Sequence, residues 1–185
     1  MGFIQQVFRV TASADRHTFQ ILTKRHERLQ SLAKDLKWAP NIWVGVSVEN
    51  QYWADCRVPA LPKVPTAVRF LSVEPLLKAV DLRAYLHGIR WVIVGGESGP
   101  KARPMQPEWV RRIRDDWVEA SVHFFFKQWG GRTSKVGRRL LDGCPYDEMP
   151  PPQKSLADVR TPPAIERSSV PLAVTPRIVA ASIGG

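Results

Sequence analysis

Short apolar segments and amphipathic segments alternate along the chain from residue 3 to residue 131. Five of the apolar segments are rich in β-branched and aromatic residues, which is typical of strands buried on both faces. These predicted strands cover residues 18–22, 42–46, 68–71, 91–94 and 122–126. The segments between them carry apolar residues at helical spacing or helix-capping signals. The predicted helices cover residues 3–12, 25–37, 51–57 and 82–86, and a further helix begins at Pro107.

Strands and helices that alternate in this way indicate βαβ units and a parallel sheet. Polar residues also come directly after every predicted strand. In order, they are Thr-Lys, Ser-Val-Glu-Asn, Ser-Val-Glu-Pro, Gly-Gly-Glu-Ser and Lys-Gln-Trp. A doubly wound sheet gathers its ligand groups at one switch point, whereas a (β/α) barrel builds its site from the carboxyl ends of several strands. We therefore expect an α/β fold, an incomplete (β/α) barrel with about five parallel strands.

The regular pattern ends at Gly131. We expect residues 137–150 to wrap the edge of the domain, with Leu140, Leu141 and Tyr146 as apolar anchors. From residue 151 to residue 185, prolines and small residues occur without periodicity, which predicts an extended or disordered tail. The sequence thus divides into a barrel domain over residues 1–150 and a tail over residues 151–185.

The most distinctive strand end is WVIVGGESGP, residues 91–100. Gly95 and Gly96 allow backbone conformations and close approaches that other residues do not, and Glu97 and Ser98 follow directly. This order of residues predicts a ligand site at the carboxyl end of a parallel strand. The alternative is a tight turn between strand and helix with a solvated glutamate.

Three glutamates follow predicted strands and would meet at one end of a barrel: Glu49, Glu74 and Glu97. Beside Lys24 and Lys127 they could serve acid–base chemistry, bind a hard metal ion, or accept hydrogen bonds from a ligand's hydroxyl and amino groups. Each glutamate could instead cap a helix or pair with a lysine. The sequence contains no evident Ser-His-Asp set, so we assign no catalytic residue. The candidate ligand-binding residues are Lys24, Glu49, Asn50, Ser72, Glu74, Gly95, Gly96, Glu97, Ser98, Lys127 and Gln128.

The formal net charge is +10, which favours a polyanion such as nucleic acid as partner. The densest group of basic residues follows the Gly-Gly-Glu-Ser segment and consists of Lys101, Arg103, Arg111, Arg112 and Arg114. These residues are candidates for nucleic-acid contacts. The alternative is the solvated face of a helix.

Only two cysteines occur, Cys56 and Cys144, so a disulfide framework and a metal site of the CxxC type are excluded. No apolar run reaches the roughly 18 residues of a membrane span, and the first residues lack the pattern of a secretory signal. We expect a cytoplasmic protein without a membrane partner.

Six segments in the same order carry a resemblance to a known family: HTFQILTKR, NIWVGVSVENQ, VRFLSVEPLL, WVIVGGESGPKARPM, FFFKQWG and LLDG followed by DEMP. Over about residues 3–150 the chain resembles a phage-associated family of unknown function whose barrel is similar to that of radical S-adenosylmethionine enzymes. Longer members carry an N-terminal three-cysteine motif. The resemblance implies that Ser72 and Glu74 hold a ribose and that Gly95, Gly96 and Glu97 line the adenine and methionine part.

The three-cysteine segment has no counterpart here, and Cys56 and Cys144 cannot replace three clustered thiolates. We expect an amino-terminally truncated member that keeps part of an S-adenosylmethionine-like pocket without an iron–sulfur cluster. Two rival hypotheses are a basic module that binds nucleic acid or a protein partner, and an inactive gene remnant. Because one strand is missing, another segment or another chain should cover one edge of the sheet.

Overall fold

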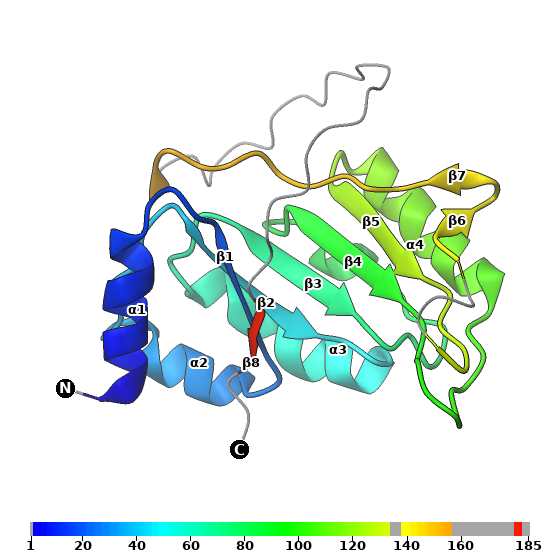
Figure 1. Ribbon diagram of the computed structural model, residues 1–185, viewed down its shortest axis with the longest axis horizontal. Coiled ribbons are helices and arrows are strands. Elements are labelled where there is room, and N and C mark those ends of the chain that lie inside the picture. Colours follow the sequence, from blue (N-terminus) through cyan, green and yellow to red (C-terminus); the bar gives the residue numbers. More distant parts are fainter. Residues whose placement is uncertain (1, 134–137, 157–179, 183–185) are drawn as a thin grey trace.

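The computed structural model describes residues 2–133, 138–156 and 180–182 and has a parallel sheet at its centre (Figure 1). The five predicted strands are confirmed within a residue or two of their expected bounds. They are β1 (Phe19–Thr23), β2 (Ile42–Ser47), β3 (Arg69–Val73), β4 (Trp91–Gly95) and β5 (His123–Gln128). Each pairs in parallel with the next in sequence order, and β8 (Ala180–Ser182) adds a sixth strand beside β1. The fold is α/β, an incomplete (β/α) barrel as predicted.

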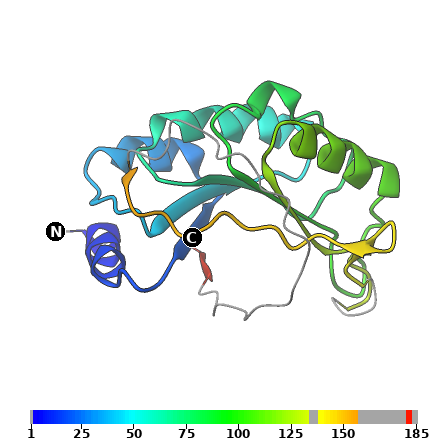
Figure 2. The same cartoon turned by 90° about the horizontal axis from the view of Figure 1, so that it is seen from above.

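Helices cover one face of this sheet. Figure 2 shows α2 (His26–Ala33), α3 (Gln51–Arg57) and α4 (Pro107–Glu119) together on that side. The strands turn alternate apolar residues toward these helices, among them Ile21, Val44, Val46, Leu71, Val92, Val94, Phe124 and Phe126. This helix-covered core is continuous, because a strand followed by a crossover helix must bury its outward residues beneath that helix.

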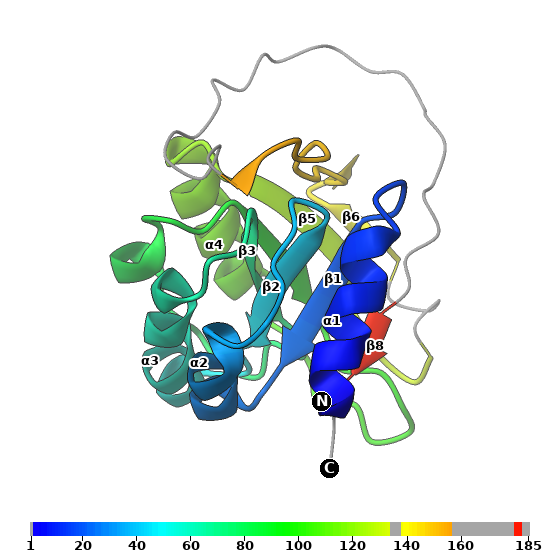
Figure 3. The same ribbon diagram turned by 90° about the vertical axis from the view of Figure 1, so that its left-hand side faces the viewer.

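The helix α1 (Phe3–Ser13) lies apart from this layer, on the β1 side of the sheet (Figure 3). Its buried residue Phe8 packs edge-on against Trp38, with the ring centroids 5.1 Å apart. The amide of Asn41 holds the end of α1, because its Nδ2 donates to the carbonyls of Thr11 and Ala14 at 2.9 and 3.1 Å. Asn41 is 8% exposed, and its buried Nδ2 thus has hydrogen-bond partners, as burial of a polar group requires.

The face of the sheet turned away from α2–α4, called the inner face below, carries a second apolar cluster. Its buried members are Trp43, Val68, Phe70 and Trp91. The rings of Trp43 and Trp91 meet edge to face, with centroids 6.1 Å apart. Gly45 lies among them, and a Cβ atom there would come within 3.0 Å of the Phe70 ring. A glycine is needed at this position because the Phe70 ring packs directly over the strand there.

Both edges of the sheet are covered. At the β1 edge, Gln20, Ile21 and Leu22 pair with the three residues of β8. At the other edge, the Phe126 amide donates to the Tyr146 carbonyl at 2.8 Å, after a hairpin of β6 (Leu140–Leu141) and β7 (Cys144–Pro145). Of the expected anchors, Leu141 is buried and Tyr146 packs on Phe124, but Leu140 is 43% exposed, so that assignment was wrong.

Two helical predictions differ from the structure. The helix α2 ends at Ala33 and not near Lys37, because the Trp38 indole donates to the Ala33 carbonyl at 2.7 Å. The predicted helix at 82–86 is only a 3-10 turn, η2 (Arg83–Tyr85). The connection between α3 and β3 contains three prolines, Pro59, Pro62 and Pro65, and forms a further 3-10 helix, η1 (Val58–Lys63). Arg69 donates hydrogen bonds to the Leu61 carbonyl within η1 and to the Val64 carbonyl just after it.

The predicted tail falls largely outside the described residues, since only residues 151–156 and β8 of it are described. No helix among the described residues has both the length and the apolar character that a membrane crossing needs.

Candidate functional site

The carboxyl ends of β1–β5 all lie at the same end of the sheet because the five strands are parallel. Several predicted site residues lie at this end on the inner face. They follow an inner-face residue by two or four positions, and alternate residues of a strand point to the same face. Lys24 follows Leu22, Ser72 and Glu74 follow Phe70, and Lys127 follows Phe125. We call the set formed by Lys24, Glu49, Ser72, Glu74 and Lys127 the polar mouth. Below it lie Leu22, Ile93 and Phe125, which are only partly buried.

Glu49 has two cationic partners. Its Oε1 lies 2.6 Å from Lys24 Nζ, and its Oε2 lies 2.8 Å from Arg57 Nη1. The same Arg57 nitrogen donates to the Ser47 carbonyl at 2.8 Å, and the guanidinium lies over the Trp53 ring, 3.9 Å from its centroid. The side chains of Glu49 and Arg57 are 9% and 5% exposed, whereas that of Lys24 is 60% exposed. Glu49 therefore belongs to a buried ion pair with an exposed lysine added to it.

Arg57 was not among the predicted site residues. It is the last residue of α3, on a helix whose rotation about its own axis the sequence does not specify. Asn50, at the other end of α3, was predicted to bind a ligand. Its Oδ1 instead accepts a hydrogen bond from the Trp53 amide at 3.2 Å. That contact makes Asn50 the N-cap of α3, and the cap turns the helix so that Arg57 points back to β2.

Glu74 forms the second part of the polar mouth. Its Oε2 lies 2.8 Å from Lys127 Nζ, and its Oε1 accepts a hydrogen bond from the Ser72 hydroxyl at 3.3 Å. A Cβ atom on Gly95 would lie 3.0 Å from Glu74 Oε2. Gly95 thus leaves room for this carboxylate, whose side chain stays 19% exposed. Residues from β3, β4 and β5 meet here.

The segments after β4 and β5 are joined backbone to backbone. The Gly96 amide donates to the Gln128 carbonyl at 2.9 Å, and the Gly131 amide donates to the Glu97 carbonyl at 2.8 Å. Ser98 and Gln128, both predicted to bind a ligand, bond to each other, with Gln128 Nε2 donating to the Ser98 hydroxyl at 2.7 Å. These two side chains therefore connect the two segments.

Glu97 has a partner within its own loop. Arg103 donates through Nε and Nη2 to the two carboxylate oxygens at 2.8 and 2.7 Å, and its backbone amide adds a third bond at 2.9 Å. The side-chain and backbone hydrogen bonds from Arg103 lower the pKa of Glu97 to about 2. Glu49, Glu74 and Glu97 thus all follow the carboxyl ends of strands at the same end of the sheet, but each carboxylate has a different cationic partner.

The hard-metal option gains no support from this arrangement. Within the described ranges, His, Cys, Asp and Glu side chains form no group of three or more that could hold a metal ion. The two cysteines come from different elements, Cys56 from α3 and Cys144 from β7.

The basic residues on and before α4 are paired with carboxylates. Arg103 pairs with Glu97, Arg111 with Asp142 and Glu108, Arg112 with Asp81, and Arg114 with Asp115 and Asp142. The four arginines of the candidate set, together with Arg83, which shares Asp81 with Arg112, thus stand beside the five negative charges of Glu97, Glu108, Asp81, Asp115 and Asp142. The group is locally near neutral, as expected for a solvated helix surface.

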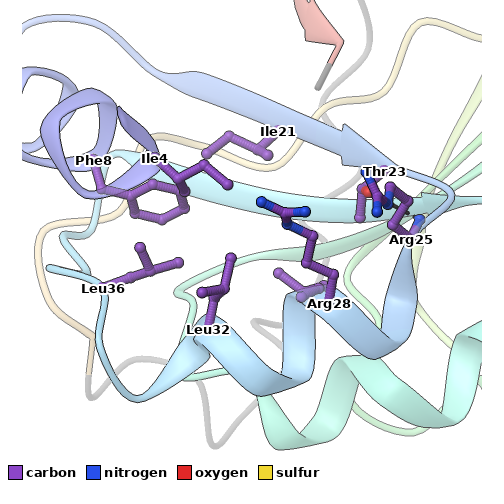
Figure 4. Close-up of a pocket in the computed structure, with 9 residues that line it drawn as sticks. Ile4, Phe8, Ile21, Thr23, Arg25, Arg28, Leu32 and Leu36 are labelled. Carbon is purple, nitrogen blue, oxygen red and sulfur yellow. Dashed lines mark hydrogen bonds between the residues drawn. The ribbon is translucent and has the colours of Figure 1, made fainter. Parts of the chain in front are cut away.

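A separate apolar notch lies between α1, β1 and α2 (Figure 4). Phe8, Ile21, Leu32 and Leu36 are among the residues that line it, and its cavity volume is about 40 Å³. Figure 4 shows the Arg28 side chain extending over this notch from α2. A space of this size holds no more than a few water molecules, so the notch is a packing feature of α1.

Together, these features define an α/β protein whose incomplete barrel has an apolar inner face below a polar mouth. The chain belongs to the family described as "Protein of unknown function (DUF5131)", whose model matches residues 1–150. The expected uncharacterised domain family is thereby confirmed. The comparison with curated proteins and the comparison with solved structures each gave no match.

Proposed function

We propose that the polar mouth binds a small ligand of the nucleoside type, with S-adenosylmethionine as the first candidate. The observation that carries this proposal is the presence of two carboxylate–cation groups, built from residues of four strands, at the carboxyl ends of the parallel strands. Glu49 with Lys24 and Glu74 with Lys127 lie above a partly exposed apolar layer. Small-molecule sites commonly combine apolar walls with a few convergent polar groups in this way.

Each part of the mouth has a chemical role in the proposed complex. Glu74 accepts hydrogen bonds from ribose hydroxyls, because its carboxylate is partly exposed and is oriented by Ser72 and Lys127. Ile93 and Phe125 give the base an apolar surface, because both lie on the inner face and stay partly exposed. The resemblance to radical S-adenosylmethionine enzymes, which assigns the ribose to Ser72 and Glu74, supports the same placement.

The nucleic-acid alternative has weaker support. A protein that binds nucleic acid through its backbone needs cations available for phosphates, but Arg103, Arg111 and Arg114 are each paired with carboxylates. Binding to arbitrary DNA that weakens steeply with salt would favour this alternative. An inactive remnant would bind neither DNA nor nucleosides.

Calorimetric titration with S-adenosylmethionine and with adenosine tests the proposal. The wild-type chain should bind at one site, and Glu74→Gln should weaken binding by about ten- to a hundredfold, because a hydrogen bond to a charged group contributes roughly 1.5–3 kcal/mol. Glu108→Gln is the matched control, since the Glu108 side chain is 73% exposed on α4. No binding of either compound, or equal weakening by both substitutions, would contradict the proposal.

A further inference from the structure

The two halves of the polar mouth differ in charge. At the β3–β5 side, Glu74 is balanced by Lys127 alone, which leaves no net charge. At the β1–β2 side, Glu49 lies within hydrogen-bonding distance of both Lys24 and Arg57, which leaves one surplus positive charge. The mouth therefore has a cationic end next to β1 and a neutral end next to β4.

Arg57 is the permanent partner of Glu49. Its guanidinium is buried, bonds to the Ser47 carbonyl as well as to Glu49, and lies against the Trp53 ring. Separating a buried ion pair leaves an uncompensated charge away from water, which is strongly unfavourable, so this pair stays closed.

Lys24 is held much less firmly. Its side chain is 60% exposed, and exposed ion pairs contribute little to stability because water and salt screen them. Lys24 can therefore leave Glu49 for another anion at little cost, because Arg57 continues to neutralise the carboxylate.

From these contacts, we infer that Lys24 forms a subsite for an anionic group of the ligand, a phosphate or a carboxylate, and that Arg57 is the positioning residue that makes Lys24 available. This inference rests on the proposed function. It also orients the ligand, with its anionic group next to β1 and its hydroxyl groups at Glu74. The first and third strands are two strand spacings apart, roughly 10 Å, which suits a ligand the size of a mononucleotide.

The test compares adenosine, AMP and S-adenosylmethionine by calorimetric titration at constant ionic strength. In the wild type, AMP should bind at least tenfold more tightly than adenosine. Lys24→Met should abolish this preference, whereas Lys37→Met, at an exposed position outside the mouth, should leave it unchanged. A loss of S-adenosylmethionine affinity in Lys24→Met would identify a carboxylate as an accepted anion, and an effect on AMP alone would identify a phosphate.

Arg57→Met provides a second arm. With Arg57 gone, Lys24 becomes the sole counter-ion of Glu49, so the preference for AMP should fall although Lys24 is present. If this variant does not fold, the Lys24→Met comparison decides alone. Equal affinities of the wild type for AMP and adenosine, or a preference that survives in Lys24→Met, would overturn the subsite but leave the proposed function standing. Absence of binding by all three compounds would overturn both.

Discussion

Gly96 lies directly against the backbone of Trp129, and a Cβ atom on Gly96 would come well within 3.0 Å of the Trp129 carbonyl oxygen. Gly96→Ala should therefore destabilise the fold by roughly 1–3 kcal/mol or more, because a backbone atom cannot move aside as a flexible side chain can. Chemical denaturation of this variant and of Gly95→Ala provides the measurement. Gly95→Ala should cost less, since its Cβ would meet the Glu74 side chain at 3.0 Å. Equal stability of Gly96→Ala and the wild type would show that Gly96 serves a ligand and not the backbone contact.

The ion pair between Glu97 and Arg103 should make stability depend on pH in the acid range. Its carboxyl pKa falls from 4.5 to about 2 on folding, so its stabilising contribution is complete above pH 4.5 and is lost as the pH falls toward 2. The difference in melting temperature between the wild type and Glu97→Gln should shrink across that window. Glu108→Gln, at an exposed position on α4, should show a much smaller difference. A Glu97→Gln difference that does not change with pH would contradict the ion pair.

Removal of the Arg57 side chain should be among the most destabilising changes near the carboxyl ends of the strands. Arg57→Met leaves Glu49 buried with only an exposed lysine, which should cost roughly 3–5 kcal/mol. The double variant Glu49→Gln with Arg57→Met should cost clearly less than the sum of the single changes. Arg111→Met, which breaks an exposed pair with Asp142, should cost less than about 1 kcal/mol. Additive costs for Glu49 and Arg57 in urea denaturation would exclude a coupled pair.

Truncation after Leu156 should leave a cooperatively folded body. Among the residues whose burial is described, the larger buried core runs from Phe8 to Leu141, all of which this truncation keeps. The truncated chain should self-associate more readily, because loss of β8 uncovers the β1 edge. Scanning calorimetry and light scattering check the two expectations. Disappearance of the cooperative transition would show that the removed residues are part of the core.

The strands could be predicted from the sequence because burial on both faces leaves uninterrupted apolar runs, as in β2 and β4. The position of the polar mouth followed from the same pattern, since parallel strands place all their carboxyl ends together. The partners of the carboxylates could not be predicted in the same way. Arg57 reaches Glu49 through the rotation of α3, and Arg103 reaches Glu97 through the shape of a loop.

Pairing between residues far apart in the chain could also not be predicted from the sequence pattern. The strand β8 is only three residues long and pairs with residues near the other end of the chain. The role of Gly96 likewise depends on a contact with Trp129, from the next strand along the sheet. A short motif indicates that such a glycine is needed, but only the packing of the two segments shows whether a ligand or a backbone atom requires it.

The central claim is that a nucleoside-type ligand binds at the carboxyl ends of β1–β5. Photoaffinity labelling with 8-azidoadenosine, followed by peptide mapping by mass spectrometry, tests the location most directly. The account predicts labelled peptides that contain the ends of these strands, around Lys24, Glu74 or Lys127, and a loss of labelling when excess adenosine is present. Labelling confined to α2–α4, or labelling that excess adenosine does not reduce, would contradict it.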